Sequence, residues 1–402
     1  MYNFTFHVPT RIHFGKGQIK HLTELAESGS KVLLVYGGGS IKRAGIYDTA
    51  MGLMKEAGLT VFELSGVEPN PKIGTVRRGA EMCKKEGIDM VLAIGGGSTI
   101  DCAKVVAAAA KYDGDAWDLV LNSRLIKAAL PIYSVLTLSA TGSEMDNTAV
   151  ISDLTKNEKW ACAAPSMKPT MSILDPEYTY SVSKKQTAAG TADMMSHTFE
   201  NYFSTVPGCD VQKRLAEGLL KVMIANGPVA LREPDNYDAR ANLMWAASHA
   251  INGLVGDGVS QTWPIHMIEH ELSAFYDITH GVGLAILTPV WMEFLLRGKA
   301  AAAPMGSDAY LAVMRRLARF GRNVFGLDAA RRAQDVIVAE SAVLSLKSFF
   351  FETLGIPATL SAVGITDEDN FEVMAEKAVK NAAGWYVPLT ADEVVEIYRA
   401  AK

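Results

Sequence analysis

At 402 residues the chain is longer than one core usually organises, so two domains are expected. Hydrophobic residues make up 49% of it, enough for a large buried core, and its net charge of −5 argues against nucleic acid or an anionic membrane as partner. The four cysteines are scattered, which indicates buried thiols in a reducing compartment. With no secretory leader and no membrane-spanning run of ~18 apolar residues, we expect a cytoplasmic protein.

The first half of the chain alternates between strands and helices. Residues 2–14 alternate polar and apolar side chains, which predicts a strand or hairpin at a sheet edge, where another chain can pair. Further strands are expected at 32–36, 59–65, 90–94 and 131–136, with helices near 17–28, 43–57 and 72–87 and an alanine-rich helix after Ser98. Continuous apolar strands of this kind belong to parallel sheets covered on both faces, so a doubly wound α/β domain is predicted.

Two of these strands run directly into three glycines and a serine. The turns are Gly37, Gly38, Gly39 and Ser40, and Gly95, Gly96, Gly97 and Ser98. Glycines let the backbone approach an anion, and the following helix presents free N–H groups to it. One such turn could equally be a tight connection, but two in one sheet favour a dinucleotide. Asp101, in the first turn of the alanine-rich helix after Ser98, would cap that helix or face the nicotinamide ribose.

A loop rich in hydroxyl groups follows the strand at 131–136, and α/β sheets place ligands at such strand ends. A hairpin-like excursion over 147–174 comes next, and its Lys159 is expected on the surface, as most lysines are. The further candidates for cofactor binding in this loop and in neighbouring turns are Thr137, Leu138, Thr141, Asn70 and Asn147.

After residue 180 the strand signals nearly vanish. Helical patterns cover 184–204, 209–232, 237–255, 264–275, 282–296, 306–325, 330–354, 366–381 and 390–401. Capping boxes are predicted at Ser183 and Thr390. The expected organisation is therefore a Rossmann-like α/β domain over 1–180 and an all-α domain over 181–402.

Histidines and one carboxylate recur at helical spacing in this second half. Asp193 and His197 are four residues apart, as are His266 and His270, and His280 precedes a glycine. One carboxylate and several imidazoles from separate helices could converge on a divalent metal. A rival interpretation is the H-x-x-E-H signature of a zinc peptidase, which His266, Glu269 and His270 spell. That reading explains a metal but leaves both glycine turns without a role.

The chain resembles the iron-containing (group III) alcohol dehydrogenase family, closest to its butanol-dehydrogenase-like, NAD(P)H-dependent aldehyde reductase branch. The resemblance covers essentially the full length and is carried by GGGSTIDCAK (95–104), SATGSE (139–144), LDP (174–176), DMMSH and HMIEH with the later HG. It implies the metal ligands Asp193, His197, His266 and His280, a pyrophosphate loop at Gly95–Ser98, and Asp101, Thr137, Thr141 and Lys159 near the nicotinamide. It also implies a homodimer in which N-terminal strands associate.

Several alternatives stay open beside this resemblance. Gly39, followed by Ser40, Lys42 and Arg43, favours NADP(H) over NAD(H), because these residues leave space and positive charge for a 2′-phosphate. The metal is Fe²⁺ or Zn²⁺, and His270 is a candidate proton relay or a group that orients its neighbours. The expected substrate is a small aliphatic aldehyde or alcohol. A lyase of the dehydroquinate synthase type and a catalytically silent dinucleotide-binding protein are the remaining rivals.

Overall fold

A computed structural model describes residues 1–327 and 334–402 of the chain. Its contacts define two compact units. The sheet unit comprises residues 7–183 and 233–253, and the helical unit comprises residues 1–6, 184–232 and 254–402. The division of the chain into domains 1–180 and 181–402 stays a prediction, because each compact unit combines segments from both ranges.

The sheet unit is built on six parallel strands in the order β1-β8-β5-β4-β2-β3. The strands are β1 (Arg11–Phe14), β2 (Lys31–Tyr36), β3 (Thr60–Leu64), β4 (Met90–Gly95), β5 (Ile132–Leu136) and β8 (Met171–Leu174). The central strands are buried along most of their length, as their continuous apolar runs predicted. Neighbouring side chains of a strand enter two different cores, one on each face of the sheet.

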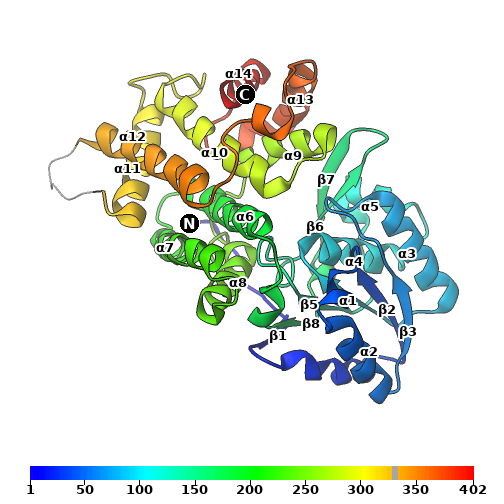
Figure 1. Cartoon of the computed structure of the whole chain (residues 1–402). Coiled ribbons are helices and arrows are strands. Elements are labelled where there is room, and N and C mark those ends of the chain that lie inside the picture. Colours follow the sequence, from blue (N-terminus) through cyan, green and yellow to red (C-terminus); the bar gives the residue numbers. More distant parts are fainter. Residues whose placement is uncertain (328–333) are drawn as a thin grey trace. The chain divides into compact units, whose positions relative to one another are not determined.

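Helices cover both faces of this sheet (Figure 1). On one face lie the 3-10 helix η1 (Gln18–Glu27), α1 (Ser40–Arg43) and α2 (Ile46–Glu56), and on the other α3 (Ile73–Glu86), α4 (Gly97–Ala109) and α5 (Ala116–Leu121). The unit also contains α8 (Tyr237–Ile251) and the short 3-10 turns η2 (Ser123–Leu125), η3 (Pro165–Met167) and η4 (Pro176–Thr179).

Two of the following three expectations for this unit need correction, those for residues 2–14 and 43–57. The segment 2–14 forms a strand only from Arg11, because β8, its partner at the sheet edge, offers four residues for pairing. The helix expected near 17–28 is present as the 3-10 helix η1. The helix expected at 43–57 is interrupted at Gly45, whose φ of 71° lies in the left-handed region.

The excursion after β5 is a hairpin of β6 (Thr148–Asp153) and β7 (Glu158–Ala163), paired antiparallel. Asn157 turns the chain between them with a positive φ of 48°. The pairing sets Lys159 opposite Ser152, and the lysine side chain is buried, against the expectation of a surface position. The hairpin packs against α4 and α5, which the sequence around Lys159 does not reveal.

The helical unit contains no strand among its described residues. Its helices are α6 (Lys184–Tyr202), α7 (Asp210–Arg232), α9 (Pro264–Tyr276), α10 (His280–Leu296), α11 (Asp308–Phe325), α12 (Asp335–Lys347), α13 (Phe371–Ala378) and α14 (Ala391–Ala401). A π-helix, η5 (Ser348–Thr353), and the 3-10 turns η6 (Ser361–Val363) and η7 (Val379–Gly384) connect the later ones. The predicted capping box at Thr390 with Glu393 is confirmed, and the first residues of the helix expected at 330–354 lie outside the described part.

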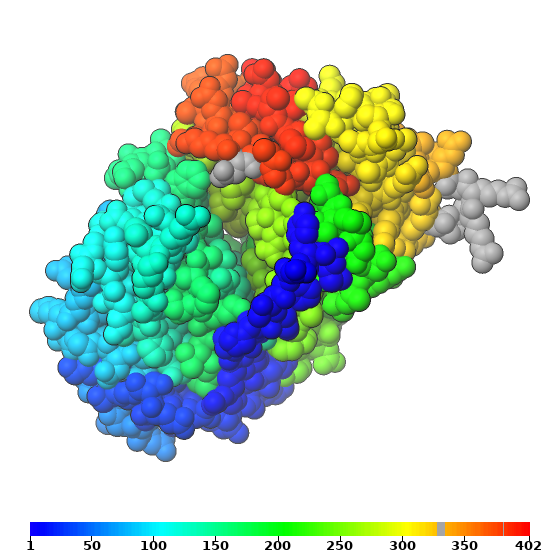
Figure 2. Space-filling model, turned by 180° about the vertical axis from the view of Figure 1, so that it is seen from behind, coloured from blue at the N-terminus to red at the C-terminus, as the bar shows by residue number. Residues whose placement is uncertain are grey.

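The N-terminal segment runs as an extended strip on the surface (Figure 2). Its first residues belong to the helical unit, where the amide of Tyr2 donates to the carbonyl of Gly258. Tyr2, Phe4 and Phe6 are exposed. In the described parts of the chain, every helix is too short or too polar to cross a membrane.

Candidate active site

One face of α6 carries three acidic or imidazole groups. Asp193, His197 and Glu200 follow at positions i, i+4 and i+7, the spacing that aligns side chains along one side of a helix. The helix is buried from Thr187 onward, so these polar side chains lie inside the helical unit and need internal partners.

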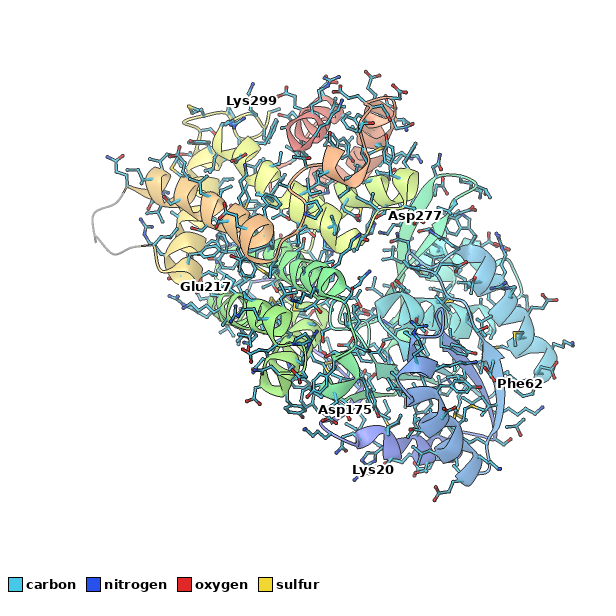
Figure 3. All side chains as sticks on the ribbon, viewed as in Figure 1. Lys20, Phe62, Asp175, Glu217, Asp277 and Lys299 are labelled. Carbon is cyan, nitrogen blue, oxygen red and sulfur yellow. The ribbon has the colours of Figure 1, made fainter. Side chains whose placement is uncertain are left out.

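Glu200 supplies one such partnership by capping α9. Trp263, with a positive φ of 50°, and Pro264 at the first helical position start α9, and Asp277, labelled in Figure 3, ends it in a left-handed conformation. The Glu200 carboxylate accepts the backbone amides of Ile265 at 2.5 Å and His266 at 3.2 Å. It also bonds Nδ1 of His266, which fixes the ring and directs its Nε2 away.

Glu269 plays the matching part for His280, the first residue of α10. Its carboxylate bonds His280 Nδ1 and accepts the hydroxyl of Ser273 at 2.5 Å. Gly281 and Gly283 permit this close packing. A Cβ on Gly281 would overlap the carbonyl oxygen of Ala189 on α6, and one on Gly283 would lie 2.8 Å from the Glu269 side chain.

The three packed helices bring the four predicted metal ligands close together. Oδ1 of Asp193 lies 3.7 Å from Nε2 of His197, 3.9 Å from Nε2 of His266 and 3.8 Å from Nε2 of His280. The ligand atoms of Asp193, His266 and His280 all lie within 4.8 Å of one another, and Nε2 of His197 approaches this group at Asp193.

The electrostatics of the cluster favour a bound cation. Burial, together with the neighbouring His266 and His280, holds the pKa of His197 well below its ordinary value, so this imidazole is neutral and keeps a lone pair. Burial opposes protonation of His266 as well, but the Glu200 carboxylate raises its pKa. Nε2 of His266 is buried and has no hydrogen-bond partner among the described residues, which suits a metal-binding nitrogen.

His270, the fifth residue of interest, lies one turn after His266 on α9. Its ring centroid is 6.0 Å from that of His266 and 5.4 Å from that of His280, and the side chain is buried. It therefore borders the cluster of four. The H-x-x-E-H peptidase arrangement is not favoured, because Glu269 is held by His280 and Ser273.

In the sheet unit the two glycine turns follow neighbouring strands, β2 and β4. The chain leaves β2 for β3 on one side and returns to β4 on the other, so the turns flank the point where the strand order reverses. Open α/β sheets bind ligands at this point. The second turn opens the thirteen-residue helix α4, whereas the first opens the four-residue α1, so only α4 has an extended dipole behind its turn.

The hydroxyl-rich loop packs directly on the second glycine turn. Cβ atoms on Gly96 and Gly97 would lie 3.2 Å from Leu138 and 2.8 Å from the Cβ of Thr141. The amide of Thr137 donates to the carbonyl of Gly95 at 3.0 Å. The structure therefore gathers Thr137, Leu138 and Thr141 at the turn formed by Gly95, Gly96, Gly97 and Ser98.

The remaining cofactor candidates have structural contacts. Asp101 is buried and caps no helix end: its carboxylate accepts the Ser143 hydroxyl at 2.6 Å and the Val150 amide at 2.9 Å. The carbonyl of Asn147 accepts the Ala164 amide at 3.2 Å, and Asn70 adopts a positive φ of 49° in its turn. Glu200 was missed by sequence reasoning, although its spacing from Asp193 and His197 was a signal for it.

Comparison with known proteins places both halves in one family. Residues 9–176 match the family described as iron-containing alcohol dehydrogenase, and residues 187–402 match the C-terminal part of the Fe-containing alcohol dehydrogenase family.

Individual relatives extend over the whole chain. NADH-dependent butanol dehydrogenase B of Clostridium acetobutylicum is 50% identical, with 99% of each chain covered. The NADPH-dependent aldehyde reductase YqhD of Escherichia coli is 37% identical, with 100% of each chain covered. The crystal structure of NADH-dependent butanol dehydrogenase A from Thermotoga maritima has a TM-score of 0.89 at 36% identity and covers 100% of this chain and 99% of its own. The chain therefore belongs to the iron-containing alcohol dehydrogenase family.

Proposed function

We propose that the chain interconverts primary alcohols and aldehydes of the butanol and butyraldehyde class by hydride transfer with a nicotinamide cofactor. The convergence of three imidazole nitrogens on the Asp193 carboxylate is the observation that carries this proposal. The names of its relatives, butanol dehydrogenases and an aldehyde reductase, support the substrate class.

Asp193, His197, His266 and His280 are the proposed ligands of one divalent metal, Fe²⁺ or Zn²⁺. Such an ion polarises an aldehyde carbonyl and lowers the pKa of an alcohol. The donor set of three nitrogens and one oxygen fits both metals.

The protein's own groups prepare this chemistry. Glu200 and Glu269 hold the Nδ1 atoms of His266 and His280, so that the protons stay on Nδ1 and the Nε2 lone pairs face Asp193. Asp193, His197 and His266 are buried and His280 is 22% exposed, which limits the access of water to the reacting carbonyl. His270 is the proposed relay that passes the alcohol proton between the substrate and solvent.

The cofactor is proposed to lie along the second glycine turn, formed by Gly95, Gly96, Gly97 and Ser98. The first glycine turn would hold its adenosine end, with Gly37, Gly38, Gly39 and Ser40. The other residues proposed to surround it are Asp101, Thr137, Leu138, Thr141, Asn147, Lys159 and Asn70. We favour NADP(H), because Gly39 adds no carboxylate and Arg43 lies 4.0 Å from a Cβ built there. Relatives named for either cofactor make the comparison of NADH with NADPH decisive. We also propose a cytoplasmic homodimer in which the N-terminal segments of the two chains associate, since Tyr2, Phe4 and Phe6 are exposed there.

The experiment follows nicotinamide absorbance as butyraldehyde is reduced, with each cofactor, before and after chelation. We expect oxidation of the reduced nicotinamide to stop when chelator is added and to return when Fe²⁺ or Zn²⁺ is restored. His280→Ala should lose activity together with the ion held by these four ligands, while His7→Ala, at an exposed histidine, keeps both. Full activity and metal in His280→Ala would refute the ligand set.

A further inference from the structure

A second group of metal-binding side chains lies in the sheet unit, outside the proposed active site. His13 on β1 and His21 and Glu24 on η1 bring one ligand atom each within 4.8 Å of the others. Their side chains are partly exposed, at 17% for His13, 25% for His21 and 28% for Glu24, so an ion can reach them from solvent. Figure 3 locates η1 by its labelled residue Lys20.

The imidazoles of His13 and His21 lie face to face. Their rings stack with centroids 3.6 Å apart and an interplanar angle of 11°. His13 Nε2 is buried and lacks a hydrogen-bond partner within the described chain, although it lies 3.8 Å from Oε2 of Glu24. A buried polar nitrogen without a partner costs free energy that a bound ligand would recover.

His21 shows how a cation would enter. Its Nε2 bonds the side-chain oxygen of Gln18 at 3.1 Å, which requires a proton on Nε2 and leaves Nδ1 as the coordinating atom. Nδ1 lies 2.5 Å from Oε1 of Glu24, so these two possible ligand atoms already face one another. A divalent ion that binds both atoms would take His13 Nε2 as its third ligand. Arg11 occupies the other carboxylate oxygen, Oε2, at 3.0 Å and leaves Oε1 to the ion.

We propose that His13, His21 and Glu24 form a second, surface site for a borderline divalent transition metal, with Zn²⁺ as its occupant. Two imidazoles and one carboxylate suit zinc, and solvent completes the coordination. The ion would fasten η1 to the edge strand β1.

The test counts metal ions bound by untagged, full-length protein after equilibrium dialysis against Zn²⁺, with Co²⁺ absorption as a second readout of ligand geometry. We expect two ions per chain in the wild type and one in both His21→Ala and His13→Ala. His7→Ala, which changes an exposed histidine outside the cluster, should keep two. His280→Ala should retain the surface ion alone.

The outcomes separate this proposal from the proposed function. One ion in the wild type that persists in His21→Ala and His13→Ala overturns the surface site and leaves the inner one intact. One ion that is lost in His21→Ala but kept in His280→Ala supports the surface site and contradicts the inner one. Circular dichroism of each variant distinguishes loss of a ligand from loss of the fold.

Discussion

At the scale of single residues, the candidate active site depends on carboxylates behind the imidazoles. Glu200 and Glu269 each bind the Nδ1 atom of a histidine, and Glu200 also accepts the free backbone amides at the start of α9. Side chains in such positions set ring orientation and ligand basicity without touching the ion.

Glu200→Gln tests this role. The amide oxygen can still accept the backbone amides of α9, but it no longer provides the charge that holds the Nδ1 proton of His266. We expect metal affinity to fall by about 10- to 100-fold. A competition titration against a chromophoric chelator measures the change, and Glu376→Gln, an exposed glutamate, is the control. Equal affinity in both variants would contradict the role of Glu200.

Glu144 gives a pH-dependent prediction in the sheet unit. Burial raises the pKa of this carboxyl to about 7, although the Ser248 hydroxyl donates to it and opposes the shift. The folded state thus prefers the proton. Its contribution to stability is complete below the unfolded-state pKa, near 4.5, and is lost as pH rises toward 7.

Glu144→Gln should therefore flatten the decline of unfolding free energy between pH 4.5 and 7. The difference between wild type and variant should change by about 3 kcal/mol across this window, as an upper bound. Urea titrations at several pH values measure it. Curves that stay parallel for the two proteins would show that Glu144 does not titrate in this range.

At the scale of elements, periodicity predicted the parallel strands well because buried strands are apolar throughout. Periodicity failed where the start of a strand or the burial of a side chain depends on the neighbouring elements. β1 begins only at Arg11 because β8 is short, and Lys159 is buried where its hairpin packs on the neighbouring helices.

The i, i+4 spacing placed Asp193 and His197 on one face of α6, but their approach to His280 depends on the packing of α10. The role of Glu200 at α9 depends on a contact across 65 residues, which helical periodicity does not report.

Gly281→Ala tests the packing of α10 on α6. The new Cβ would lie 2.7 Å from the carbonyl carbon of Ala189, which is backbone and cannot rotate away, so α10 must move. We expect a loss of about 1–3 kcal/mol in unfolding free energy, with weaker metal binding because His280 is adjacent.

Gly218→Ala on α7 is the matched control, since nothing lies within 4 Å of a Cβ built there. It should be neutral or stabilising by up to about 1 kcal/mol. Chemical denaturation of both variants decides the matter, and similar stabilities would mean that α10 packs more loosely than the structure indicates.

At the scale of the whole molecule, all four proposed metal ligands come from the helical unit, on α6, α9 and α10. A ligand that binds only the folded state stabilises it by RT ln(1 + [L]/Kd), which is about 2.7 kcal/mol when the free ion is at 100 times Kd. Removal of the ion should therefore destabilise the helical unit, while the cofactor turns of the sheet unit keep their contacts.

Differential scanning calorimetry with and without chelator measures this coupling. The protein used is His21→Ala, so that the surface cluster does not contribute. For a unit of roughly 200 residues, 2.7 kcal/mol corresponds to a fall in Tm of about 5–10 °C. His280→Ala in the same background should show no response to chelator, because it lacks a ligand of the ion. A Tm that ignores chelator in both proteins would mean that the three helices are held together without any metal, and the inner cluster would then be a network of buried ion pairs.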